Sequence, residues 1–252
     1  MIEVGDACPC NSQTIYIHIG FGRTGTSWLQ KNLFPSLCGI TYHGKFQDEY
    51  PAWLRYWNYM DPLLLPEYVD FIRRNIFSGQ LSRHLISSEA FTQTAGIVSQ
   101  AERIKSVIPS PKIILVLREP SSLVISKFRH LKARGILKGD MEEHLDFMVN
   151  PYDWVRRKPL YLLDYNFPLV IRHLRNQFGD DKVLILKFET LLTAPDKFIN
   201  LICNYLEIKT PAGVDLSVIN ESNSSIFVDN STRNLLFNYF NKLFSYDSIA
   251  EG

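Results

Sequence analysis

Apolar residues recur along this chain with two alternating periods, one typical of strands and the other of helices. The first run, Thr14 to Ile19 (TIYIHI), is rich in β-branched and aromatic residues and ends at Gly20. This composition is typical of a strand. Thr26 to Phe34 follows, with its apolar positions at helical spacing. The pattern therefore predicts a strand, a glycine loop and a helix.

Two later runs are apolar without alternation, as strands are when both faces of a sheet are covered. These runs are Lys112 to Leu117 (KIILVL) and Lys182 to Phe188 (KVLILKF). Arg118-Glu119-Pro120 follows the first of them, and proline is favoured in the first turn of a helix. We therefore expect a buried strand that leads directly into a helix.

The remaining segments continue the alternation and predict an α/β fold. Strands are expected at 39–43 and 84–88, and helices at 66–77, 97–108, 160–178, 195–206 and 232–244. Strands that alternate with helices form right-handed crossovers, so we expect three layers, with a central parallel sheet flanked by helices as in P-loop proteins. With 252 residues, 46% of them hydrophobic, the chain fits one domain over 1–252, with 1–13 a poorly ordered N-terminal segment.

Three unusual segments each begin where a predicted strand ends. They are Gly20 to Trp28, Ser87 to Phe91 and Arg118 to Ser126. The carboxyl ends of parallel strands lie at one edge of a sheet, and ligands bind there in open α/β folds. We therefore expect these segments to form the functional site.

The first segment, within "IHIGFGRTGTSWLQ", departs from the Walker A loop in an informative way. Gly20 and Gly25 have the required spacing, but Thr26 stands where that loop has its lysine. Arg23 provides a cation inside the loop instead, and Ser27 adds a hydroxyl at the helix start. A glycine loop that enters a helix presents backbone N–H groups to an anion, so the segment predicts a phosphate site.

Two motifs resemble those of sulfotransferases that use 3'-phosphoadenosine 5'-phosphosulfate (PAPS). The sequence "RTGTSW" (residues 23–28) is similar to the loop with which that family binds the 5'-phosphosulfate. The segment "LVLREPSSLVISKF" is similar to its 3'-phosphate segment, with Arg118 and Ser126 at the matching positions. "VLILKFETLL", at 183–192, resembles the family's late strand and helix and bears on the fold.

The resemblance implies a set of residues that bind the co-substrate PAPS, with no metal. The set is Gly22, Arg23, Thr24, Gly25, Thr26, Ser27, Trp28, Arg118 and Ser126. Trp28 would stack near the adenine, although a core aromatic on an amphipathic helix explains it nearly as well. The family's loop often has lysine where Arg23 stands, and "RKGxxGDW", which cytosolic aryl and steroid sulfotransferases use, is absent. The match is thus closer to bacterial or carbohydrate-type members.

Sulfuryl transfer also needs a base for the acceptor proton and positive charge where the leaving phosphate becomes negative. Arg23 can supply the charge. Glu89, in "LISSEAF", is the first candidate for the base, because the strand before it should neighbour the glycine loop. His43, in "TYHGK", is the rival, with Lys45 beside it. His18 lies within a central strand, which favours a structural role.

Four further stretches bear on the acceptor or on the nucleotide, and each has an ordinary structural explanation. The basic segments 127–138 and 156–158 would attract an anionic glycan or lipid, but charge runs are usually solvated helix faces. The aromatic stretch 50–59 would line an acceptor cleft or pack as a helix face. Asn220, Ser222 and Asn223 fit a surface loop better than a nucleotide contact.

Charge and cysteine content narrow the setting. With 27 basic and 26 acidic residues, nothing favours a nucleic-acid partner. Cys8, Cys10, Cys38 and Cys203 lack metal-site spacing and indicate reduced thiols in the cytoplasm; no apolar run is long enough to span a membrane. The sequence thus favours a cytoplasmic sulfotransferase acting on a small-molecule, glycan or lipid acceptor. A P-loop kinase or NTPase with a degenerate loop, or a non-catalytic nucleotide-binding module, is the alternative.

Overall fold

The structure is a computed structural model of the chain. It describes residues 13–45, 57, 66–77, 81–89, 91, 96–108, 110–141, 165–216 and 228–252. Every structural statement below concerns these residues.

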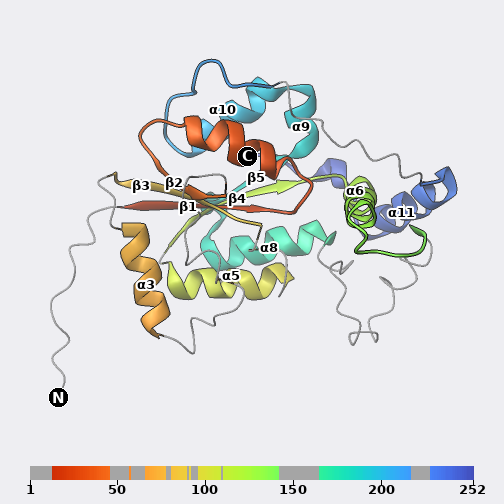
Figure 1. Cartoon of the computed structure of the whole chain (residues 1–252), viewed down its shortest axis with the longest axis horizontal. Coiled ribbons are helices and arrows are strands. Elements are labelled where there is room, and N and C mark those ends of the chain that lie inside the picture. Colours follow the sequence, from red (N-terminus) through yellow and green to blue (C-terminus); the bar gives the residue numbers. More distant parts are fainter. Residues whose placement is uncertain are drawn as a thin grey trace.

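A five-stranded parallel sheet forms the centre of the molecule (Figure 1). Its spatial order is β2-β3-β1-β4-β5. The strands are β1 (Thr14–Gly20), β2 (Thr41–Gly44), β3 (Arg83–Ser87), β4 (Lys112–Leu117) and β5 (Val183–Lys187). All pairings are parallel, with His18 opposite Ser87 on β3 and Gly20 opposite Val116 on β4. The parallel sheet predicted from the apolar runs is confirmed.

Helices cover both faces of this sheet (Figure 1). One face carries α1 (Thr26–Trp28), the π-helical turn η1 (Leu29–Leu33), the 3₁₀ turn η2 (Phe34–Ser36), α9 (Phe188–Thr193) and α10 (Pro195–Tyr205). The other carries α3 (Pro66–Phe77), α5 (Gly96–Val107) and α8 (Phe167–Phe178). Alternate strand residues feed two separate cores, so that Ile17 and Ile113 pack on the α5 side while Tyr16 and Ile114 pack on the α10 side. The three layers predicted from the sequence are therefore present.

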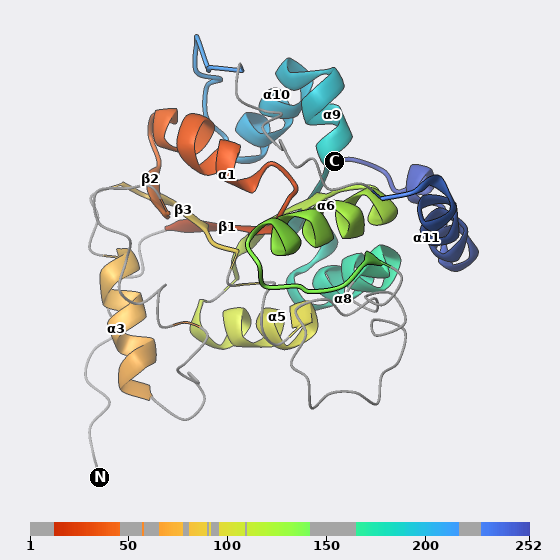
Figure 2. The same cartoon turned by 45° about the vertical axis from the view of Figure 1, so that its right-hand side comes forward.

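The carboxyl ends of the strands are flanked by two further helices. They are α6 (Pro120–Ala133) and α11 (Asn230–Leu243). Figure 2, turned so that this end comes forward, shows α6 in front of the sheet with α9 above it and α8 below. The chain then makes a 3₁₀ turn, η6 (Tyr246–Ser248), and returns to β5.

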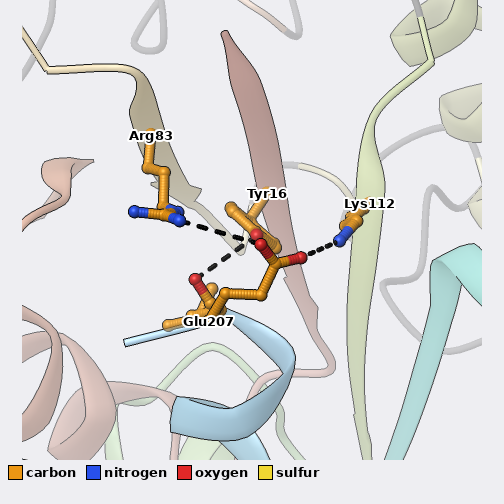
Figure 3. Close-up of polar contacts among 5 residues, drawn as sticks. Tyr16, Arg83, Lys112 and Glu207 are labelled. Atoms are coloured by element: carbon orange, nitrogen blue, oxygen red, sulfur yellow. Dashed lines mark hydrogen bonds and ion pairs between the residues drawn. The ribbon is translucent and has the colours of Figure 1, made fainter. Parts of the chain in front are cut away.

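A cluster of charges joins α10 to the opposite, amino end of the sheet (Figure 3). Lys112 Nζ donates to Glu207 Oε1 over 2.7 Å, and Arg83 lies 3.7 Å from the other oxygen. The hydrogen bond from Lys112 lowers the pKa of the Glu207 carboxyl. Lys112 Nζ also lies 5.4 Å from the ring centroid of Tyr16, whose hydroxyl donates to the Leu206 carbonyl. The glutamate is largely exposed, so we read the cluster as a modest structural clamp far from the strand ends that carry the loops.

Local structure departs from the predictions at two places. The helix predicted after the glycine loop begins at Thr26, but it widens into η1 within three residues. Phe188, predicted as the last residue of a strand, instead begins α9. A short helix inserted between two strong signals has too few residues to show its own period, so apolar spacing could not reveal it.

Candidate functional site

The three unusual segments meet at one edge of the sheet. β1 lies between β3 and β4, so the glycine loop after Gly20, the turn at Glu89 after β3 and Arg118 after β4 leave adjacent strands. This confirms that the strand ends are neighbours. The side chains around this edge, described next, form the candidate active site.

The glycine loop is held in an unusual backbone conformation. Gly25, the residue before α1, is left-handed with φ 78°, and Arg23 is also left-handed with φ 77°. Thr24 Oγ1 donates to the carbonyl of Phe21 over 2.6 Å and ties the loop to itself. A methyl group on Gly25 would lie 2.9 Å from Leu191 Cδ2, so α9 packs directly on the loop. A non-glycine residue with positive φ is strained, and such strain is often found at ligand sites.

Arg23, Ser126 and Arg118 are linked by hydrogen bonds, although about 95 residues separate the two motifs. Arg23 Nε donates to Ser126 Oγ over 3.2 Å, and Arg118 Nη1 donates to the Arg23 carbonyl over 3.1 Å. The two predicted phosphate sites are thus parts of one basic cluster, in which a loop residue contacts α6 and Arg118, two residues before α6, contacts the loop.

Arg118 sits against the first turn of α9. Its Cζ lies 5.0 Å from the ring centroid of Phe188, within cation–π range. Burial lowers the pKa of Arg118, and the Glu189 carboxylate opposes that change. An arginine pKa starts so high that the side chain remains a cation. The flat guanidinium is therefore fixed in place on one side by an aromatic ring and on another by a backbone carbonyl.

A buried polar network lies beneath the loop. His18 Nδ1 is 2.8 Å from Ser87 Oγ, and Gln30 Nε2 donates to the same oxygen over 3.0 Å. Burial lowers the pKa of His18 to about 3, so its imidazole is neutral. The network joins β1, β3 and η1, the three elements around the loop, which supports the structural role expected for His18. Gln30 lies in the π-helical turn, a local irregularity that is common near functional sites.

The two candidate bases lie in different surroundings. His43 is on the edge strand β2, with Nε2 3.2 Å from His84 Nδ1 and the two rings stacked. Burial and then His84 lower the pKa of His43 to about 4. Glu89 is partly buried two residues after β3 and interacts electrostatically with His130 on α6.

His130 is a member of this cluster that the sequence analysis did not single out. It lies one helical turn after Ser126 and is partly buried. Burial lowers its pKa, Arg23 and Arg134 lower it further, and Glu89 raises it. The i, i+4 spacing from Ser126 within the basic segment 127–138 was the available signal.

Comparison with known proteins shows the family to which the chain belongs. A sequence model of the sulfotransferase domain matches residues 14–242, from the first residue of β1 almost to the end of α11. The chain belongs to the sulfotransferase family.

Solved structures place this sulfotransferase in the same fold. A sulfotransferase from Alicyclobacillus acidocaldarius is similar with a TM-score of 0.63 and 17% identity, covering 92% of each chain. Mouse sulfotransferase SULT7A1 complexed with PAP (TM-score 0.46, 15% identity, 98% of this chain and 70% of that one) and the sulfotransferase domain from the curacin biosynthetic pathway (0.47, 13%, 91% and 97%) are more distant. No curated protein matches this chain.

The other predicted donor residues of this sulfotransferase divide between loop interior and surface. Thr24 and Thr26 are buried, Gly22 has open space around it, and Ser27 is exposed. Trp28 is 4% exposed in the core on the α10 side, and its Nε1 donates to the Asp215 carbonyl over 2.9 Å. This placement matches the core-aromatic alternative for Trp28.

Several segments considered for the acceptor or for a nucleotide contact lie outside the described residues. These are 156–158, Asn220, Ser222, Asn223 and the stretch 50–59 apart from Trp57. Trp57 is buried and donates to Gln100 Oε1 over 2.6 Å, as a core residue would. In the basic segment, Lys127 Nζ lies 5.8 Å from the ring centroid of Phe21 in the loop.

Metal and membrane signals are absent from the described part of the sulfotransferase. No group of three or more His, Cys, Asp or Glu side chains there could hold a metal ion. In the same residues, no helix is both long and apolar enough to cross a membrane.

Proposed function

We propose that this sulfotransferase moves a sulfuryl group from PAPS to a hydroxyl, or less favourably an amine, of a carbohydrate, lipid or other small metabolite. The observation that carries the proposal is the hydrogen-bonded link from Arg118 to Arg23 to Ser126. A ligand with two separate anionic groups fits a cluster in which two arginines from two motifs meet. The free thiols of Cys38 and Cys203 support a reducing compartment, and we propose the cytoplasm.

The residues present fit such a donor. The left-handed Gly25 directly precedes α1, and backbone N–H groups at the start of a helix bind anions, so the 5'-phosphosulfate would bind here together with Arg23, Thr26 and Ser27. Arg118 and Ser126 would bind the 3'-phosphate, since a guanidinium and a hydroxyl together supply several donors to phosphate oxygens. The glycine leaves no space for a side chain between the loop and α9.

Transfer then requires one bond to form and another to break at sulfur. The acceptor oxygen attacks in line, the bond from sulfur to the bridging phosphate oxygen breaks, and the adenosine 3',5'-bisphosphate (PAP) leaves. Arg23 stabilises the negative charge that develops on the departing phosphate. Glu89 takes the acceptor proton, because it follows the strand beside the loop and interacts electrostatically with His130 on α6. His43 is less suited, since its Nε2 is engaged with His84.

Calorimetry tests the donor assignment. We expect PAP to bind without a metal, and Arg118→Ala to weaken that binding by at least about 30-fold, as the loss of a charged hydrogen-bonding partner predicts. The matched control is Arg74→Ala, which removes an exposed arginine on α3. Preference for ATP with magnesium would instead identify a degenerate NTPase.

Turnover separates the enzyme from a binding module. The protein is incubated with sulfur-35-labelled PAPS and a library of hydroxyl acceptors. Label transferred to at least one acceptor is expected, whereas tight PAP binding with no labelled product would show a non-catalytic nucleotide-binding protein.

A further inference from the structure

The C-terminal segment, residues 244–252, is bound to the strand end and helix that flank Arg118. The Gly252 N–H donates to the Ile185 carbonyl over 3.1 Å, extending the hydrogen bonding of β5. Glu251 accepts from the Lys187 N–H over 2.7 Å and from Thr190 Oγ1 over 2.8 Å. Figure 2 shows the C-terminal end of the chain beside α9. The segment is thus anchored at the first turn of α9.

Within this segment, Tyr246 fixes the carboxylate of Glu189. The Tyr246 hydroxyl donates to Glu189 Oε2 over 2.8 Å, and the Glu119 N–H donates to Glu189 Oε1 over 3.0 Å. Burial raises the pKa of Tyr246, and Glu189 raises it further, so the hydroxyl keeps its proton and acts as a donor. Lys187 Nζ lies 5.0 Å from the Tyr246 ring centroid, within cation–π range. Both oxygens of Glu189 therefore have fixed donors.

Glu189 is also the acid that acts most strongly on Arg118. Its charge opposes the effect of burial on the Arg118 pKa more than any other group does. The second acid nearby, Glu119, uses its carboxylate to cap α6 through the N–H groups of Ser121 and Ser122. A carboxylate free to turn toward Arg118 would form an ion pair and compete with an incoming phosphate for the same N–H donors.

We propose that Tyr246 is a positioning residue for the donor site, because it holds Glu189 away from the N–H donors of Arg118 and leaves them for the 3'-phosphate. The inference rests on the proposed function, which assigns that phosphate to Arg118. Removal of the hydroxyl frees Glu189 Oε2 while leaving the Tyr246 ring in its packing. The loss of affinity is then confined to ligands that carry a 3'-phosphate.

The experiment compares two ligands that differ in that one group. PAP carries the 3'-phosphate and adenosine 5'-phosphate lacks it. For Tyr246→Phe we expect affinity for PAP to fall about tenfold, the scale of one charge-assisted hydrogen bond, with affinity for adenosine 5'-phosphate changed less than about twofold. Tyr239→Phe on the outer face of α11 is the matched control and should change neither affinity.

A double-mutant cycle tests whether the effect of Tyr246→Phe depends on the Glu189 carboxylate, and it separates that effect from a general folding defect. In a Glu189→Gln background no ion pair with Arg118 can form, so Tyr246→Phe should change PAP affinity less than about twofold. Thermal unfolding of each variant reports folding separately. Equal loss of both ligands in Tyr246→Phe, no loss of either, or an undiminished tenfold loss in the Glu189→Gln background would overturn the positioning role. A wild-type protein that binds both ligands equally would instead remove the 3'-phosphate assignment itself, and this inference with it.

Discussion

A single methyl group on Gly25 should destabilise the loop through two separable effects. The first is backbone strain, because φ 78° costs an L-residue about 1–2 kcal/mol. The second is overpacking, because the new carbon would lie 2.9 Å from Leu191 Cδ2 and 3.1 Å from Phe188 Cε2. Overpacking of this kind adds about 1–3 kcal/mol, although the Leu191 methyl can partly yield. We expect Gly25→Ala to lower the free energy of unfolding by about 2–4 kcal/mol.

Two other glycines separate these effects. Gly39 has nearly the same backbone angle, φ 79°, with nothing within 4 Å of an added carbon, so Gly39→Ala measures strain alone. Gly22 has neither a positive φ nor a neighbour, so Gly22→Ala should leave stability unchanged or raise it slightly. Urea denaturation gives the free energy of unfolding of each of the three variants. Calorimetry with PAP measures how each substitution in the loop changes ligand affinity. A Gly25→Ala protein no less stable than Gly39→Ala would refute the packing of α9 on the loop. Undiminished PAP affinity in Gly25→Ala would refute the proposal that the glycine loop binds the phosphosulfate.

Two further predictions concern titration and proton transfer. His18 is neutral in the fold because its pKa is depressed to about 3, whereas the unfolded residue titrates near 6.5; its contribution is complete above pH 6.5 and is lost as pH falls toward 3. Between pH 6.5 and 5, this residue should therefore lower the free energy of unfolding by up to about 1.4 kcal/mol per pH unit. His18→Gln should flatten this pH dependence, measured by urea denaturation. An unchanged pH dependence would exclude His18 as its source. Glu89→Gln should keep PAP affinity and lower kcat about 100-fold or more, as loss of a general base does; full turnover would move the role to another group, with His43→Gln as the next variant.

The fold prediction rested mainly on the pattern of apolar residues, because the strands of a parallel sheet that is buried on both faces are continuous apolar runs in the sequence. KIILVL and TIYIHI form β4 and β1, as predicted. The strand order places β1 between β3 and β4, so the three segments expected to form the site leave adjacent strands. The glycine loop that we propose binds the donor could be recognised for a related reason, since its glycines and its cation lie close together in the sequence. Both features depend on residues within about ten positions of one another.

What escaped prediction depends on contacts between distant parts of the chain. The bond between Tyr246 and Glu189 joins residues 57 apart, and no pattern in either segment indicates it. His43 and His84 are 41 apart, and their contact is what changes the surroundings of a candidate base. His130 was obscured by its basic neighbours, which resemble a solvated helix face. Such pairings follow from how the layers pack and have no period of their own.

The bond from Arg118 to the carbonyl of Arg23 has a consequence for selectivity. It joins two segments through the protein's own backbone and side chains, so the protein itself sets the spacing between the two phosphate sites proposed above. A preorganised frame loses little conformational entropy on binding. Such a frame also selects ligands by the distance between their charges, because a nucleotide whose charges lie at another separation can bind only one of the two sites at a time. On the proposed function, the site would therefore measure the distance between two phosphates as well as their charge.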